Sequence, residues 1–233
     1  DPRRSGARDR RLVAVVGETR LRRLLAPMLD EQEFLSPFGV RSLSRVHAEA
    51  PATLKLTSAH GDVALFVRYQ PGEANDGLGG GNVNWRGPVW LSLNTLLIQA
   101  LLQHYLYYGN NLRIECPTGS GHHMTLFEIA EHLSQRLANL FQCDANGQRA
   151  AFGAASATID ESAWRDHLPL FEYFDGDSGA GLGASHLTGA TGLIAPLLRF
   201  FSTMTADEFL RHGDGGSLLS CGRREAWPTM VKV

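Results

Sequence analysis

Two tryptophans, two asparagines and an arginine lie close together in the glycine-rich segment 80–90. Glycine permits tight, open backbone conformations, and Pro88 suits the first turn of the apolar helix that should follow. The loop would therefore present aromatic faces, amides and a guanidinium group at a helix entry. This mixture suits sugars, whose C–H faces stack on rings while their hydroxyls bond fixed donors and acceptors. The alternative is a helix-entry loop whose tryptophans fill the core.

A second segment places one carboxylate, Glu172, between Phe171 and Tyr173, just before a glycine-rich stretch at 176–183. Carboxylates are rarely buried without a partner. Glu172 is therefore either a salt-bridged core residue or a positioned general base whose pKa is tuned by its aromatic surroundings.

Four segments in this order resemble glycoside hydrolase family 63, the family of processing α-glucosidase I and mannosylglycerate hydrolase, and especially its bacterial glucosidase-like members. They are residues 28–44, 82–90, 115–121 and 171–192. Several ordered motifs at consistent spacing are far more specific than any one of them. The resemblance implies an (α/α)6 barrel with its active site at one mouth, and inverting hydrolysis of α-glucosidic or related α-mannosidic bonds. The substrates would be oligosaccharides or glycosyl-glycerates.

In an inverting glycosidase, one carboxylic acid protonates the glycosidic oxygen while a carboxylate roughly 6.5–9.5 Å away activates water on the opposite face. By its place in the Phe-Glu-Tyr motif, Glu172 matches the general base of the family. The family's general acid is an Asp in a motif absent from this sequence. We expect that Asp upstream of Asp1, with Asp30 and Asp76 as weaker stand-ins. The isolated fragment should therefore be inactive.

The resemblance and side-chain chemistry together assign substrate-binding roles around this base. Trp85 and Trp90 would form a stacking wall, although Trp90 sits one turn into the expected helix and favours the core. Arg86 would bind sugar hydroxyls or a carboxylate, or form a structural salt bridge. Asn82 and Asn84 would read hydroxyls or cap the loop.

Tyr173 and His186 flank the proposed base and would tune or orient it, with a purely structural histidine as the alternative. The expected substrate-binding residues are Asn82, Asn84, Trp85, Arg86, Gly87, Trp90, Tyr173 and His186.

Composition is that of a water-soluble part of an enzyme. With 233 residues, of which 43% are hydrophobic, the chain supports one sizeable core, and its net charge of −2 gives no basic footprint for nucleic acid. No apolar run spans a bilayer and no secretory signal opens the chain, while the start at Asp1 indicates an internal or processed fragment. Cys116, Cys143 and Cys221 are scattered without zinc spacing, which favours reduced thiols in the cytoplasm.

We expect no cofactor, no metal, and no nucleic-acid or membrane partner. The expected partners are the sugar substrate and the remaining N-terminal part of the same enzyme.

Hydrophobic periodicity predicts a mainly α fold with a small β-hairpin insertion. The expected hairpin strands are residues 54–56 and 63–69, and a capping box at Thr125 and Glu128 opens an amphipathic helix. The expected helices are residues 10–29, 88–108, 125–141, 163–173 and 189–201. They are fewer than half of those in a complete toroid. Together with the resemblance, this count implies a C-terminal portion of the (α/α)6 barrel that exposes apolar helix faces.

The expected domain organisation is a partial catalytic domain at 1–204 and a divergent, flexible tail at 205–233. Three positions depart from the expected family pattern: Val83 replaces a small polar residue, Ala190 replaces an aromatic, and Pro196 should kink the last helix. These departures keep open a second interpretation, a non-catalytic carbohydrate-binding or decayed remnant of such an enzyme.

Overall fold

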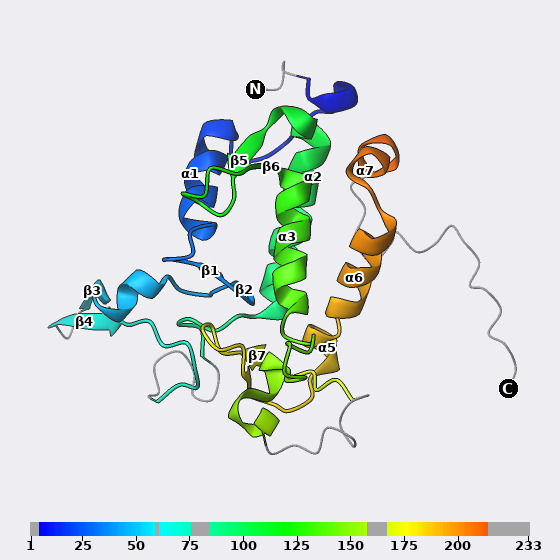
Figure 1. Ribbon diagram of the computed structural model, residues 1–233. Coiled ribbons are helices and arrows are strands. Elements are labelled where there is room, and N and C mark those ends of the chain that lie inside the picture. The colour runs from blue at the N-terminus through cyan, green and yellow to red at the C-terminus, as the bar shows by residue number, and fades with distance from the viewer. Residues whose placement is uncertain (1–4, 59–60, 76–83, 158–166, 214–233) are drawn as a thin grey trace, which may run out of the picture.

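Helices make up most of the regular structure in the computed structural model, which describes residues 5–58, 61–75, 84–157 and 167–213 (Figure 1). The mainly α chain expected from the sequence is confirmed. The α-helices are α1 (Glu18–Met28), α2 (Leu91–Tyr108), α3 (Leu126–Ala138), α5 (Thr188–Thr191), α6 (Ile194–Thr203) and α7 (Ala206–His212). The short 3-10 helices are η1 (Ala7–Asp9), η2 (Arg45–Ala48), η3 (Gly109–Asn111) and η4 (Ala150–Ala157).

Helices α2 and α3 pack along each other at the centre of the molecule. Helix α6 packs on α3, and α5 and α7 contact α2. Helix α1 lies on the opposite side of the central pair from α6 and α7 in Figure 1, near the β5 strand. Within the described ranges, the helices do not close into a barrel.

The core lies between the two central helices. Ile98 and Tyr105 of α2 and Ile129 and Leu133 of α3 are fully buried. The other side of α2 is also apolar but open, with Leu96 62% exposed. An apolar cavity of about 500 Å³ lies between α1 and α2, lined by residues that include Leu21, Leu24, Leu25, Met28, Leu97 and Leu101. The chain thus exposes apolar helix faces, as expected from the sequence.

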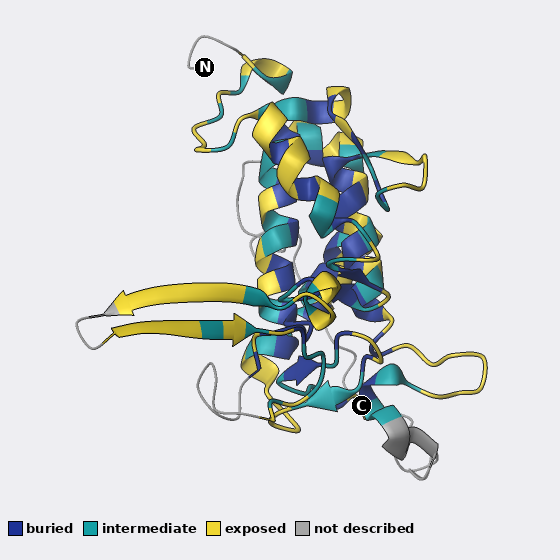
Figure 2. Ribbon diagram, turned by 90° about the vertical axis from the view of Figure 1, so that its left-hand side faces the viewer, coloured by how far each residue is buried: buried dark blue, intermediate teal, exposed yellow. Residues whose placement is uncertain are grey.

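The described strands form four two-stranded antiparallel sheets. They are β1 (Leu35–Ser36) with β2 (Gly39–Val40), β3 (Ala52–Ser58) with β4 (Gly61–Val67), β5 (Arg113–Glu115) with β6 (His123–Thr125), and β7 (Tyr173–Phe174) with β8 (Gly181–Leu182). The predicted hairpin is confirmed, because Leu54 pairs with Leu65 and Leu56 pairs with Val63. It projects from the helices and is mostly exposed (Figure 2).

The predicted capping box at the start of α3 is confirmed. The Thr125 amide donates to Glu128 Oε2 at 2.6 Å, and the Glu128 amide donates to Thr125 Oγ1 at 3.3 Å. Two amides of the first turn that lack helical partners are thereby satisfied.

The prediction that the long helix begins at Pro88 was wrong, because α2 begins at Leu91. Trp90 is the residue before the helix, in an extended conformation, and does not lie one turn inside it. Val89 forms antiparallel bridges with both Arg41 and Phe174. Pairing with these two distant segments keeps the backbone extended where local sequence favours helix.

Three other helical segments also differ from prediction. Residues 167–174 are not helical, and Tyr173 and Phe174 instead form β7. Helix α1 begins at Glu18, not residue 10. The segment 189–201 divides into α5 and α6, so Pro196 falls in the first turn of α6, where a missing N–H removes no helical bond.

Helix α7 was not predicted, and it lies in the region expected as a tail. Its Phe209 is 6% exposed and packs against the rings of Tyr105, Phe127 and Phe200. The domain boundary at residue 204 stays a prediction.

Candidate active site

The tryptophan loop and the Glu172 segment lie side by side. Val89 and Phe174 exchange two backbone hydrogen bonds, of 2.8 and 3.0 Å, and Val89 also bridges to Arg41. Strand β7 therefore lies where α2 begins, at the lower end of the helices in Figure 1. Two segments more than eighty residues apart in sequence meet at one end of the central helix pair.

Three aromatic rings from these segments form a continuous stack. The Trp85 and Trp90 rings lie 4.0 Å apart at 8°, and the Trp90 and Tyr173 rings lie 4.6 Å apart at 18°. Exposure falls from 46% at Trp85 to 6% at Trp90 and 0% at Tyr173. The indole N–H of Trp90 donates to the Asn84 carbonyl at 3.0 Å. The outer ring of the stack is thus exposed, while the two inner rings are buried and hold it in place.

Asn84 braces the loop that carries Trp85. Its side-chain N–H groups donate to the carbonyls of Gln70 and Gly72 at 2.7 and 2.6 Å, and its Oδ1 accepts from the Arg86 amide at 3.0 Å. With 1% exposure and these three contacts, the Asn84 side chain is buried and bonded to the backbone of two segments.

Gly87 and Arg86 complete the described part of this loop. Gly87 has a φ of +148°, and a side chain there would meet the Tyr69 ring and the Gln70 carbonyl. Only glycine fits such a close approach. Arg86 is buried, and its carbonyl accepts from the Gln70 amide at 2.7 Å. Asn82 and Val83 lie outside the described residues, as does Asp76.

Glu172 is half-buried and held by the backbone of the glycine-rich turn. Its Oε2 accepts from the Ala184 amide at 3.1 Å, and its own amide donates to the Ala184 carbonyl at 2.9 Å. Glu172 is therefore fixed beside β7, next to the innermost ring of the stack. In the described contacts, this carboxylate is held through Oε2.

His186 does not join this group in the described contacts. It is exposed, and its Nδ1 lies 3.5 Å from the Leu170 amide. Asp30, the internal stand-in for the acid, accepts from the Gln32 amide at 2.8 Å in a local turn. This contact of the Asp30 carboxylate is local and does not link it to Glu172.

Glu73 is a site residue that sequence reasoning missed. Its Oε2 accepts from the Tyr173 hydroxyl at 2.6 Å, and its Oε1 accepts from the Gly183 amide at 3.0 Å. Glu73 follows Gly72 and precedes the glycine-rich residues 77–81, and no local pattern marks it as a partner of residues 100 and 110 positions away.

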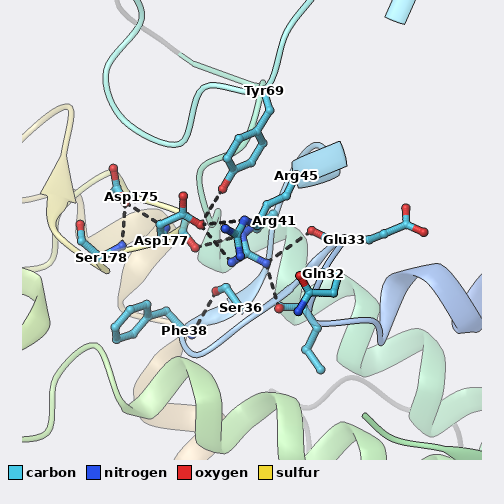
Figure 3. Close-up of polar contacts among 12 residues, drawn as sticks. Gln32, Glu33, Ser36, Phe38, Arg41, Arg45, Tyr69, Asp175, Asp177 and Ser178 are labelled. Carbon is cyan, nitrogen blue, oxygen red and sulfur yellow. Dashed lines mark hydrogen bonds and ion pairs between the residues drawn. The ribbon is translucent and has the colours of Figure 1, made fainter. Parts of the chain in front are cut away.

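Sequence reasoning also missed Arg41. Its side chain links strand β1 to the turn between β7 and β8 (Figure 3). Its guanidinium, 4% exposed, donates to the carbonyls of Leu35 and Gly176 at 2.8 and 3.1 Å and to Asp177 Oδ1 at 3.0 Å. The Tyr69 hydroxyl donates to the same Asp177 oxygen at 2.9 Å. This Arg41 network fixes the turn between β7 and β8.

Both tyrosines of these networks are held in the neutral form. Burial raises the pKa of Tyr173 above its ordinary value of 10.0, and the hydrogen bond to Glu73 and the charges of Glu73 and Glu172 add to the rise. Burial also raises the pKa of Tyr69; the Arg41 charge lowers it, and the Asp177 hydrogen bond raises it. Each phenol is therefore a constant donor near neutral pH.

We expect the free energy of unfolding to fall as the pH rises above about 10, because the unfolded chain releases these phenolic protons before the folded chain does. Urea titrations between about pH 8 and about pH 11 measure this slope. Tyr69→Phe and Tyr173→Phe should each make the free energy of unfolding fall less steeply with pH. An unchanged slope in the double variant would show that these two tyrosines do not cause the fall.

Within the described residues, no group of three or more His, Cys, Asp or Glu side chains is placed to hold a metal ion. Cys116 is a buried free thiol and Cys143 an exposed one, while Cys221 lies outside the described ranges. Among the helices that the structure describes, none is both long and apolar enough to cross a membrane.

Two curated relatives are similar to this chain. The uncharacterized protein YMR196W of Saccharomyces cerevisiae is 45% identical over 194 residues, which cover 82% of this chain and 18% of the relative. A probable mannosyl-oligosaccharide glucosidase of Schizosaccharomyces pombe is 32% identical over 87 residues, which cover 37% of this chain and 7% of the relative. The chain thus spans less than a fifth of the length of either relative.

The family model of the mannosylglycerate hydrolase MGH1-like glycoside hydrolase domain matches residues 12–190. This range contains the aromatic stack, Glu73, the Arg41 network and Glu172. The chain belongs to the MGH1-like glycoside hydrolase family.

Proposed function

We propose that this chain carries the base-bearing, sugar-stacking part of an inverting glycosidase. Its substrates are α-linked glucosyl or mannosyl units in oligosaccharides or glycosyl-glycerates. Glu172 is the general base, and Trp85 is the face on which the sugar ring stacks. One relative is named a probable mannosyl-oligosaccharide glucosidase and the family is named for mannosylglycerate hydrolase, which supports glucosyl and mannosyl compounds as the substrate class.

The observation that carries this proposal is the juxtaposition of Glu172 with the three-ring stack. Glu172 directly precedes Tyr173, the innermost ring, and the outer ring of Trp85 is 46% exposed. A sugar on Trp85 would lie over a rigid apolar surface. Because Trp85 and Tyr173 are the two ends of the stack, we propose that the substrate extends from Trp85 along the edge of the stack to the Glu172 carboxylate.

In the proposed reaction, Glu172 takes a proton from water as that water attacks the anomeric carbon. The glycosidic bond breaks, and a carboxylic acid on the other face protonates the leaving oxygen. The acid must stand roughly 6.5–9.5 Å from the base so that the water fits between them. We propose that an Asp outside this chain supplies the acid, so the chain alone does not hydrolyse sugars.

The same proposal accounts for the open apolar side of α2. In an (α/α)6 toroid, each helix is covered by neighbours, so a portion of the ring leaves apolar faces uncovered. Leu96 of α2 and Leu24 of α1, 62% and 54% exposed, mark such a face. We propose that the remaining part of the enzyme covers it and closes the barrel.

A second candidate function is sugar binding without hydrolysis. The exposed ring of Trp85 favours it, since stacking needs no acid. Among the departures from the family pattern, Pro196 causes no disruption in the structure, because it occupies the first turn of α6. Ala190 lies half-buried in α5, at the position where the family resemblance implies an aromatic residue.

The test is to assay the full polypeptide that the gene encodes on α-glucosides, α-mannosides and glycosyl-glycerates. Trp85→Ala should raise KM about tenfold, since a stacked aromatic pair contributes about 0.5–1.5 kcal/mol. Trp85→Phe, which keeps a ring, is the matched control and should stay near the wild type. Sugar binding with no turnover on any substrate would favour the non-catalytic alternative.

A further inference from the structure

Residues 69–73 form a connecting segment, the strut, which hydrogen-bonds both to the tryptophan loop (residues 84–90) and to the turn between β7 and β8. On one side, the Gln70 amide donates to the Arg86 carbonyl at 2.7 Å, and Asn84 donates to the carbonyls of Gln70 and Gly72. On the other side, the Gly176 amide donates to the Pro71 carbonyl at 3.1 Å. The strut thus contacts both halves of the candidate active site and ends at Glu73.

Glu73 uses its two oxygens on two different parts of that site. Oε2 accepts from the Tyr173 hydroxyl at 2.6 Å, the short distance of a charge-assisted hydrogen bond. Oε1 accepts from the Gly183 amide at 3.0 Å. One carboxylate therefore holds both the innermost ring of the aromatic stack and the peptide after β8.

The next amide along the chain holds the proposed base. The Ala184 amide donates to Glu172 Oε2 at 3.1 Å, directly after the Gly183 amide that Glu73 holds. Two successive amides thus bind two carboxylates, and their bonded oxygens lie no more than about 10 Å apart. Each negative charge is compensated by its own donor, which lessens the repulsion between the two.

Gly183 makes this arrangement possible. Its φ is +69°, and a Cβ there would lie 2.7 Å from the Tyr173 ring and 2.8 Å from Glu172 Oε2. The absence of a side chain allows the turn to approach the ring and the base together.

We propose that Glu73 is a positioning residue, which holds the aromatic stack and the Glu172 carboxylate in fixed relation to each other. The effect of Glu73 on hydrolysis rests on the proposed function, whereas its effect on the position of the aromatic stack does not. Glu73 acts through Tyr173 and through the 183–184 backbone, so its loss should misplace the base without removing it.

Glu73→Gln is the main test variant, because its side chain has the same shape but one oxygen becomes an NH2 group that cannot accept from a donor. In the full polypeptide, kcat should fall ~10²-fold with little change in KM, as expected from a displacement of about 1 Å. Glu73→Asp, which keeps the charge, should recover part of the loss. Glu131→Gln, the same change at an exposed position of α3, is the matched control.

Circular dichroism of this chain gives a readout independent of hydrolysis. Stacked indoles couple electronically, so the Trp85–Trp90 pair should give a couplet that Trp85→Phe removes. Glu73→Gln should weaken that couplet, because the ring under Trp90 loses its anchor.

Three results would overturn the proposal: wild-type kcat and couplet in Glu73→Gln, an effect on KM alone with the couplet intact, or a loss of stability alone. The first would show no role, the second a direct sugar contact, and the third ordinary structural support. If every variant and the wild type lack hydrolytic activity, the proposed function fails, while the couplet still decides whether Glu73 positions the stack.

Discussion

Glu172→Gln should lower the kcat of the full polypeptide by about 10²–10⁴-fold, the range that a general base contributes. The amide is close in size to the carboxylate but cannot take a proton from water. Its carbonyl oxygen can still accept the Ala184 amide, which donates to Glu172 Oε2 at 3.1 Å in the wild type. The turn should therefore keep its shape, and sugar binding at Trp85 should persist.

Two measurements separate a loss of chemistry from a loss of structure. Quenching of tryptophan fluorescence by the sugar should give a Kd within a few-fold of the wild type, because the stack is untouched. Glu131→Gln on the exposed side of α3 should retain wild-type turnover. Turnover unchanged in Glu172→Gln would remove Glu172 as the base.

Arg41→Met should lower the free energy of unfolding by about 2–4 kcal/mol, because it leaves buried backbone acceptors without donors. The carbonyls of Leu35 and Gly176 both accept from the buried guanidinium, at 2.8 and 3.1 Å. Methionine fills much of the space but donates nothing. Urea unfolding of the chain measures the difference.

The ion pair between Arg41 and Asp177 should account for little of this loss. The Asp177 side chain is 42% exposed, so solvent screens the pair, and Asp177→Asn should cost less than about 1 kcal/mol. Arg41→Lys should fall between the two, since an ammonium cannot match the fork of a guanidinium. An Asp177→Asn loss as large as that of Arg41→Met would show that the charge pair, and not the backbone contacts, stabilises the turn.

Local patterns in the sequence predicted the elements that depend on neighbouring residues. The capping box at Thr125 and Glu128 and the antiparallel hairpin around residues 52–67 are confirmed. Both arise from contacts within a few residues, or across one turn, which periodicity and turn chemistry encode. The mainly α class follows from the same patterns.

Long-range contacts could not be predicted in this way. Trp90 precedes α2, and does not lie within it, because Val89 pairs with Arg41 and Phe174 from two other segments. The segment 163–173 was expected to be helical, yet Tyr173 and Phe174 form β7, which pairs with β8, and Phe174 also bridges to Val89. No local signal encodes these contacts.

The candidate site shows the same division. Glu172, Trp85 and Tyr173 stand in motifs rich in aromatic residues and glycine, and the structure brings their segments together. No such motif in the local sequence marks Glu73 or Arg41 as a site residue. Their roles depend on partners 100 and 136 positions away, Tyr173 and Asp177. Asn84 and His186 carry groups that suit sugar binding, but the first is used in backbone contacts and the second is exposed.

The most direct measurement is proton NMR of the sugar that the full polypeptide first releases from an α-linked substrate. A general base at Glu172 predicts the β-anomer, because water attacks from the face opposite the leaving group. The β-anomer signal should be nearly absent when the Glu172→Gln variant replaces the wild type at the same protein concentration. Release of the α-anomer first, or of the β-anomer at the wild-type rate from Glu172→Gln, would contradict it.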